Sequence, residues 1–262
     1  MFKLFSIVFM IMKQNLKSII SYPKSFILEF IGDILLTVVG ILFINIVFLN
    51  IPTIQGMGKY QVILIYIFAE LNVGIFTAVF GGIIFNFGYE YILCGKIEKF
   101  IIQPYDTYFL VLFSKANFPL YGDQVFLFFY FIYALVKCGI EISIITILNI
   151  FLMFFLAQII LINIFTLITS LNFYIKNSED NWLIFWNMLD FSKYPTSIYP
   201  TIIQKLLTFI IPLAFISYKP ILYLFSKNLL KMLVAIFINI ILFIGIKRVF
   251  DKGLKNYESC GS

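Results

Sequence analysis

Long apolar runs, separated by short polar stretches, follow one another along almost the whole chain. A helix needs about 20 apolar residues to cross the hydrocarbon core of a bilayer. The sequence therefore predicts an all-α polytopic membrane protein in which six transmembrane helices follow a short N-terminal segment, within one domain covering residues 1–262. The predicted spans are residues 25–48, 62–87, 119–136, 144–174, 202–217 and 229–249.

Two of these runs are irregular. Residues 142–175 hold no charged side chain, and this run is too long for one perpendicular span but too short for two spans and a turn. We expect one long or tilted helix there. The run at 202–217 contains Lys205 and Pro212. We expect it to break near Pro212, and to be followed by a short non-helical or re-entrant segment that reaches Phe225 before the last span.

The first residues of the chain have a different pattern. If residues 1–24 are helical, Lys3, Lys13 and Lys17 share one side of an otherwise apolar helix that Pro23 ends. This pattern is typical of an amphipathic helix that lies in the membrane interface. The alternative, a signal peptide, would need a small-residue cleavage site after the apolar stretch, and Lys13-Gln14-Asn15 follows instead.

The composition supports the membrane interpretation. Apolar residues make up 62% of the chain and charged residues 12%, and the mean hydropathy is +1.01. A water-soluble fold has about twice that share of charged residues, and it could not bury so much apolar surface. Histidine is absent, and Cys94, Cys138 and Cys260 have no metal-ligand spacing. We therefore expect no metal site, and we expect that the chain is not an enzyme.

The basic residues indicate the orientation. Most of the 19 lysine and arginine residues lie in the N-terminal segment, after the second and fourth spans (the latter with Lys176 and Lys193) and in the C-terminal tail. The positive-inside rule then places both termini in the cytoplasm, with the chain in the cell membrane. Because the lysines separate apolar runs instead of forming a basic stripe, we expect no nucleic-acid partner.

Acidic residues inside the predicted spans are candidates for a translocation path, because a charge within a bilayer usually faces protein or water. Glu29 and Asp33 lie one helical turn apart, and Glu70 lies deeper in the second span. The first two could instead reach lipid headgroups or Lys24, and Glu70 could bind another helix. A row of amides in the fourth span is expected to form hydrogen bonds between helices: Asn149, Gln158, Asn163 and Asn172.

The segment after the second span, residues 95–104, mixes apolar and charged residues at helical spacing. Ile97, Phe100 and Ile101 would form one apolar face. The segment could be a plain amphipathic helix at the membrane surface, or a docking helix that transmits the motion of a partner. The chain has no phosphate-binding loop, because Ile97 follows Gly95-Lys96 where such a loop needs Ser or Thr.

Residues 95–104 resemble the intracellular loop of ABC-2 type transporter permeases. Gln103 departs from that pattern, which usually has Arg before the proline. The long block from Tyr194 to Pro220 resembles a signature of one ABC-2 subfamily, and residues 253–262 resemble its ending. The resemblance assigns ATPase coupling to Gly95, Lys96, Glu98, Lys99, Phe100 and Pro104, and a structural signature to Tyr194, Pro195, Tyr199, Pro200, Pro212 and Pro220.

The resemblance implies a permease subunit of an ATP-driven exporter. It implies a cytoplasmic coupling helix after the second span, an identical or related second permease chain, and separate ATPase subunits that hold ATP and Mg²⁺. This chain would then need no cofactor of its own, and its partners would be those subunits and the bilayer. The alternative from the residues alone is a membrane assembly or scaffold protein that transports nothing.

Overall fold

The computed structural model describes residues 13, 23–84, 87–114, 122–175, 181–226 and 228–258. Over these ranges the regular structure is helical, apart from an isolated bridge between Ile54 and Met57. The expected all-α class is confirmed. The expected interfacial helix at 1–24 lies almost wholly outside the described residues.

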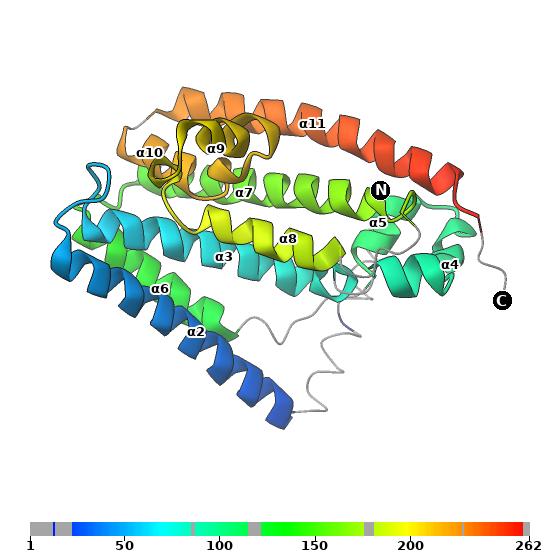
Figure 1. Cartoon of the computed structure of the whole chain (residues 1–262), viewed down its shortest axis with the longest axis horizontal. Coiled ribbons are helices and arrows are strands. Elements are labelled where there is room, and N and C mark those ends of the chain that lie inside the picture. The colour runs from blue at the N-terminus through cyan, green and yellow to red at the C-terminus, as the bar shows by residue number, and fades with distance from the viewer. Residues whose placement is uncertain are drawn as a thin grey trace.

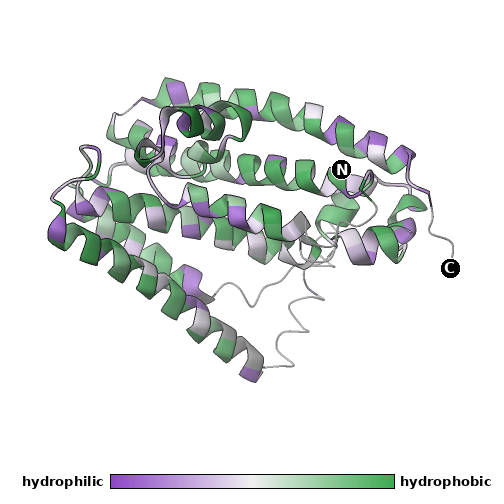
Figure 2. Cartoon of the chain, in the orientation of Figure 1, coloured by the Kyte–Doolittle hydropathy of each residue, from purple (hydrophilic) through white to green (hydrophobic). Residues whose placement is uncertain are grey.

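The long helices are apolar over most of their length, as Figure 2 shows. Among the described residues, four helices are long and apolar enough to cross a membrane, and they fall within the predicted spans 25–48, 62–87, 144–174 and 229–249 or extend a few residues beyond them. These helices are α2 (Pro23–Asn50), α3 (Lys59–Ile84), α7 (Ile144–Leu171) and α11 (Leu229–Lys255). The charge-free run is thus one 28-residue helix, as expected.

The other two predicted spans are not among these four helices. Of the predicted span 119–136, residues 119–121 lie outside the described residues, and the rest falls in helix α6 (Gly122–Lys137), of which 16 residues are described. The run at 202–217 is not one helix, because the chain from residue 181 to 225 forms a series of short helices. They are α8 (Asn181–Leu189), η3 (Asp190–Ser192), η4 (Thr196–Ile198), α9 (Thr201–Lys205), η5 (Leu206–Ile210), η6 (Leu213–Phe215) and α10 (Tyr218–Phe225).

The break that Pro212 predicts is present, since η5 ends at Ile210 and Ile211 has an extended backbone. Of the two alternatives expected for the stretch up to Phe225, the non-helical one is wrong for residues 218–225, because they form α10, and the re-entrant one stays a prediction. Pro220 permits this helix because it lies in the first turn, where backbone N–H groups have no partner within the helix.

Helix α3 is the central element. Of its most apolar window, 78% is buried inside the protein, against 17 to 33% for the other three long helices. It lies between α2 and α6 on one side and α7 on the other, and α11 lies along α7 (Figure 1). Close packing depends on small residues: a Cβ on Gly40 would lie 2.1 Å from the Tyr66 hydroxyl.

Amides join the helices, as the sequence predicts for the fourth span. Gln158 of α7 donates to the backbone carbonyl of Asn72 in α3 at 3.1 Å, and Asn163 donates to the carbonyl of Asn239 in α11 at 3.0 Å. Because no water competes inside a bilayer, such bonds help to fix helix positions. The role of Gln158 and Asn163 as interhelical contacts is confirmed.

Short elements gather at one end of the bundle, beside the last turns of α3, α7 and α11 (Figure 1). We call this the α4 end. Its elements are η1 (Phe87–Leu93), α4 (Glu98–Ile101) and α5 (Thr107–Leu112).

Candidate functional site

The predicted coupling segment begins with a sharp turn. The chain leaves α3 through the π-helical turn η1, and Gly95 then adopts a φ of +70°. Glycine suits this left-handed conformation because it has no Cβ to clash with the backbone. The Gly95 carbonyl accepts a hydrogen bond from the backbone N–H of Glu98 at 3.1 Å. The turn therefore sets the direction in which α4 leaves the bundle.

Helix α4 rests on two buried side chains. Ile97 is fully buried and Phe100 is 5% exposed, and the Phe100 ring stacks on Tyr91 of η1 with ring centres 6.1 Å apart. Ile101, which the sequence assigned to the same apolar face, is 42% exposed. Of the three residues expected on that face, Ile97 and Phe100 therefore pack against the bundle and Ile101 does not.

The outward side of α4 combines charge with an apolar tip. Glu98 and Lys99 are exposed, and Ile102 at the end of the helix is 84% exposed. The Lys99 ammonium lies 4.7 Å from the centre of the Phe100 ring. Pro104 is also exposed. We call Glu98, Lys99 and Ile102 the α4 surface.

Lys96 is held against η1 instead of facing outward freely. Its ammonium lies 2.7 Å from a carboxylate oxygen of Glu90. The hydrogen bond from Lys96 to Glu90 raises the pKa of the lysine above its ordinary value. Of the predicted coupling residues, Gly95, Lys96 and Phe100 thus shape the segment, and Glu98, Lys99 and Pro104 are available at its surface.

The C-terminal block lies against the same segment. The Tyr257 hydroxyl donates to the backbone carbonyl of Ile92 at 3.3 Å, across 165 positions of the chain. Gly253 packs on Phe173 so closely that a Cβ would lie 2.7 Å from the ring. Tyr257, from the block at 253–262, therefore binds η1 directly before the block at 95–104, and its hydroxyl would lie 3.8 Å from a Cβ on Gly95.

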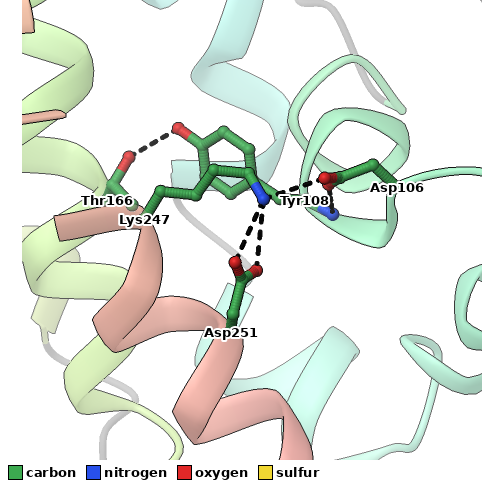
Figure 3. Close-up of polar contacts among 5 residues, drawn as sticks. All are labelled: Asp106, Tyr108, Thr166, Lys247 and Asp251. Carbon is green, nitrogen blue, oxygen red and sulfur yellow. Dashed lines mark hydrogen bonds and ion pairs between the residues drawn. The ribbon is translucent and has the colours of Figure 1, made fainter. Parts of the chain in front are cut away.

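A polar cluster joins α5 to α11 near the α4 end (Figure 3). The Lys247 ammonium lies 2.8 Å from Asp106 and 3.1 Å from Asp251, and Asp106 also caps α5 by accepting the backbone N–H of Tyr108 at 3.0 Å. The Tyr108 hydroxyl shares a 2.7 Å hydrogen bond with Thr166 of α7. The sequence analysis missed this cluster. An Asp just before a helix is a capping signal, but nothing in the sequence indicates its partner in α11.

Two of the predicted intramembrane acids line a common cavity. Asp33 of α2 and Glu70 of α3 both border a space of about 340 Å³. Glu29 lies on α2, and its side chain is outside the described part of the chain. Of the three candidates, the structure therefore brings Asp33 and Glu70 to one site.

Lys193 also lines this cavity, which corrects its expected place in a cytoplasmic loop. Its ammonium lies 3.0 Å from Glu70, near the middle of the 26-residue α3, and 3.0 Å from Asp190. The reason is that α8 packs on α3, with the ring centres of Phe185 and Phe76 5.9 Å apart, and η3 follows α8 directly. The sequence shows a lone lysine between apolar runs, and the partly buried carboxylate that attracts it is 123 positions earlier in the chain.

The signature prolines shape the chain beyond the cavity. Pro195, Pro200 and Pro212 each stand directly before a short helix, where a residue without a backbone N–H is tolerated. The Tyr199 ring packs on Phe191 with centres 5.6 Å apart. Ser217 donates a hydrogen bond to the backbone carbonyl of Ser192, which joins the segment before α10 to η3. Tyr194 is half-buried beside this junction.

Comparison with known proteins gives one match. A family model described as ABC-2 family transporter protein matches residues 34–261. The matched region includes α3, the α4 end, the residues of the cavity other than Asp33, and all six signature residues. Searches of the curated proteins and of the solved structures gave no significant match.

Proposed function

Since the chain belongs to the family of ABC-2 transporter proteins, we propose that it is the permease subunit of an ATP-driven exporter. Separate ATPase subunits hydrolyse ATP with Mg²⁺ and act on the α4 surface. The translocation path lies between this permease and a second, identical or related, permease chain. The α4 end faces the cytoplasm, where ATP is available.

One observation carries the proposal: α4 exposes Ile102 and two charges while its other side is anchored to the bundle. An exposed large apolar side chain beside charged ones suits a small protein interface, because interfaces bury an apolar centre within a polar rim. Phe100 and Tyr91 connect α4 to η1, which follows α3 in the chain. A force on the α4 surface would therefore reach the helix that contacts α2, α6 and α7.

The route through Lys247 supports the same proposal. The loop after α4 leads to Asp106, whose contact with Lys247 joins it to α11. A displacement of α4 would therefore act on two long helices, α3 and α11, at once. Coupling to a partner needs these helices to have two arrangements, each favoured by a different state of the partner.

The test compares the native chain with two variants of the α4 surface. One reverses the charges, with Glu98→Lys and Lys99→Glu together, and the other is Ile102→Asp. The affinity-tagged chain is extracted from native membranes, and the ATP hydrolysis that co-purifies with it is measured per mole of chain. We expect the native complex to hydrolyse ATP and each variant to lose at least tenfold of that activity and of ATP-dependent efflux, while its amount in the membrane is unchanged.

The matched control is Ile51→Asp, which places the same charge on an exposed isoleucine, 46% exposed, in the loop at the opposite end of the bundle. It should keep the co-purifying hydrolysis. Undiminished hydrolysis and efflux in both α4 variants would rule out coupling through this surface. A native chain that brings no ATP hydrolysis with it would rule out the exporter proposal as a whole.

A further inference from the structure

A second cavity lies at the end of the bundle opposite the α4 end, where α6 leads into α7. It has a volume of about 360 Å³ and lies between the loop after α6, the first turns of α7 and the end of α10, which packs beside α7 (Figure 1). The proposed coupling through α4 makes no use of this space, which we call the α6–α7 cavity.

Asn149 of α7 lines this cavity and is 6% exposed. The sequence predicts that its amide joins two helices, as those of Gln158 and Asn163 do, but Asn149 forms no hydrogen bond with any described residue. Its polar atoms are not fully enclosed, in contrast to the amide oxygens of Asn163 and Asn239. A molecule in the cavity can therefore reach the Asn149 amide, and a buried polar group without a partner favours one that bonds to it.

The charge on the wall of the cavity is negative. Glu141 is the one charged residue among the described residues that line it, and its carboxylate forms no ion pair with any of them. The hydroxyls of Ser143 and Thr146 are already engaged, because they share a 3.0 Å hydrogen bond and Thr146 also donates to the Glu141 carbonyl at 2.9 Å. The polar side chains that remain for a ligand are those of Asn149 and Glu141.

The loop after α6 adds hydrogen-bond acceptors. Gly139 has a φ of +72°, which turns the chain at the end of α6. The backbone carbonyls of Cys138, Gly139 and Ile140, which all line the cavity, accept no hydrogen bond from any described residue. Side chains of a helix tilt toward its N-terminus, so Asn149 is directed toward this loop. The acceptors and the Glu141 carboxylate together favour a positively charged donor.

An organic cation suits this site better than a metal ion. A metal ion needs several ligands that converge on one point, and no group of acidic or thiol side chains able to hold one exists in the part of the chain that the structure describes. The rest of the lining includes the apolar side chains of Ile145, Leu224 and Phe225. A space of this volume fits a small organic molecule, and an aromatic ring attracts an organic cation.

We propose that the α6–α7 cavity binds a primary ammonium group carried on an apolar body. The ammonium donates to Asn149 and to the carbonyls of the loop, the Glu141 carboxylate compensates its charge, and the body lies against Leu224 and Phe225. A soluble amine and the ethanolamine headgroup of a membrane lipid both present this chemistry. The site consists of residues of this chain alone, so the inference does not depend on the exporter proposal.

Binding can be measured without ATP or partner subunits. The full-length chain is placed in nanodiscs of phosphatidylcholine, whose quaternary headgroup has no N–H donor, and equilibrium dialysis with radiolabelled phenethylamine at pH 7 gives the dissociation constant after subtraction of empty nanodiscs. We expect saturable binding of phenethylammonium. Neutral 2-phenylethanol and anionic 3-phenylpropanoate, at equal concentration, should not displace it.

Two substitutions in the cavity, Glu141→Gln and Asn149→Leu, should each weaken binding at least tenfold, as expected for the loss of a contact with a charged group. The matched controls are Glu258→Gln, an exposed carboxylate in the C-terminal tail, and Asn45→Leu, a half-buried amide of α2, and both should leave the dissociation constant unchanged. Because Glu141 is exposed, its variant keeps the test decisive even where Asn149→Leu lowers the yield of folded chain.

Unchanged affinity in both cavity variants, or displacement by the neutral or the anionic analogue, would overturn the inference. Nanodiscs in which half of the lipid is phosphatidylethanolamine distinguish the two sources of the ammonium. A weaker apparent affinity for phenethylammonium there identifies the lipid headgroup as the occupant, and an equal affinity identifies a soluble amine. A failure of binding would leave the ATPase test untouched, and loss of co-purifying ATP hydrolysis would leave the binding result untouched.

Discussion

At the residue scale, two glycines of α11 show how tightly one part of the protein is packed and how open another is. A Cβ on Gly253 would lie 2.7 Å from the Phe173 ring, whereas a Cβ on Gly245 would meet nothing within 4 Å. Both residues are helical, so the intrinsic helix propensity of alanine favours the substitution equally at both. The difference between the effects of alanine at these two positions on the free energy of unfolding therefore measures packing alone.

We expect Gly253→Ala to lower the free energy of unfolding by about 1–3 kcal/mol, because the extra methyl group must displace Phe173 or the helix. Gly245→Ala should raise it by about 0.5–1 kcal/mol, because alanine restricts the unfolded chain and meets open space. Thermal unfolding of both variants in nanodiscs gives the measurement. Shifts of the same sign would show that Gly253 is not packed as described.

The sequence could identify Gly253 as part of a distinctive ending but could not say what it packs against. Phe173 is 80 positions away in the chain. In the same way, Asp33 and Glu70 are recognisable as unusual because of where they lie in apolar runs. The sequence does not single out Gln124 in this way, because an amide at the start of a helix is ordinary until the cavity that it lines is known.

At the element scale, the segment from α8 to η3 depends on the ion pair between Lys193 and Glu70. The side chains are 23% and 20% exposed, so water screens them only partly. Replacing one partner of a mostly buried pair leaves the other charge uncompensated. This destabilises the protein by more than the intact pair stabilises it.

We expect Lys193→Met to lower the free energy of unfolding by about 2–4 kcal/mol, since Glu70 and Asp190 would then face each other without a cation. Adding Glu70→Gln to Lys193→Met should recover about 1–3 kcal/mol of that loss, the coupling typical of residues in direct contact. The measurement is a double-mutant cycle, in which chemical or thermal unfolding is followed for the wild type, both single variants and the double variant. Strict additivity would mean that Lys193 and Glu70 do not interact.

Elements differ in how far the sequence determines them. The long helices can be predicted from runs of apolar residues, because an apolar segment in a bilayer satisfies its backbone hydrogen bonds by forming a helix. The stretch from 181 to 225 does not, because its short helices depend on contacts such as that of Ser217 with Ser192 and of Lys193 with α3. Pro212 predicts the break but not the direction that the chain takes after it.

At the scale of the whole molecule, the two ends of the bundle are predicted to face different compartments. Cys94 is exposed at the α4 end, and Glu141 is exposed in the loop between α6 and α7 at the opposite end. These positions allow the orientation to be tested with one reagent.

A chain with Cys138→Ser and Cys260→Ser should react with a membrane-impermeant maleimide only after the cells are permeabilised, because Cys94 would be its only thiol. A second chain that also carries Cys94→Ser and Glu141→Cys should react in intact cells. Gel-shift detection of the labelled chain provides the measurement. Labelling of Cys94 in intact cells would place the α4 end outside and contradict ATP-driven coupling there.

The contact between Tyr257 and Ile92 also has a consequence for how the protein is made. Translation proceeds at about 5–20 residues per second, so the partner of Ile92, 165 positions later, is synthesised on the order of ten to thirty seconds after it. Throughout that interval η1, on which α4 packs, lacks its contact with Tyr257. An ATPase subunit that recognises α4 only when this contact is formed would therefore join finished chains and pass over those still being translated.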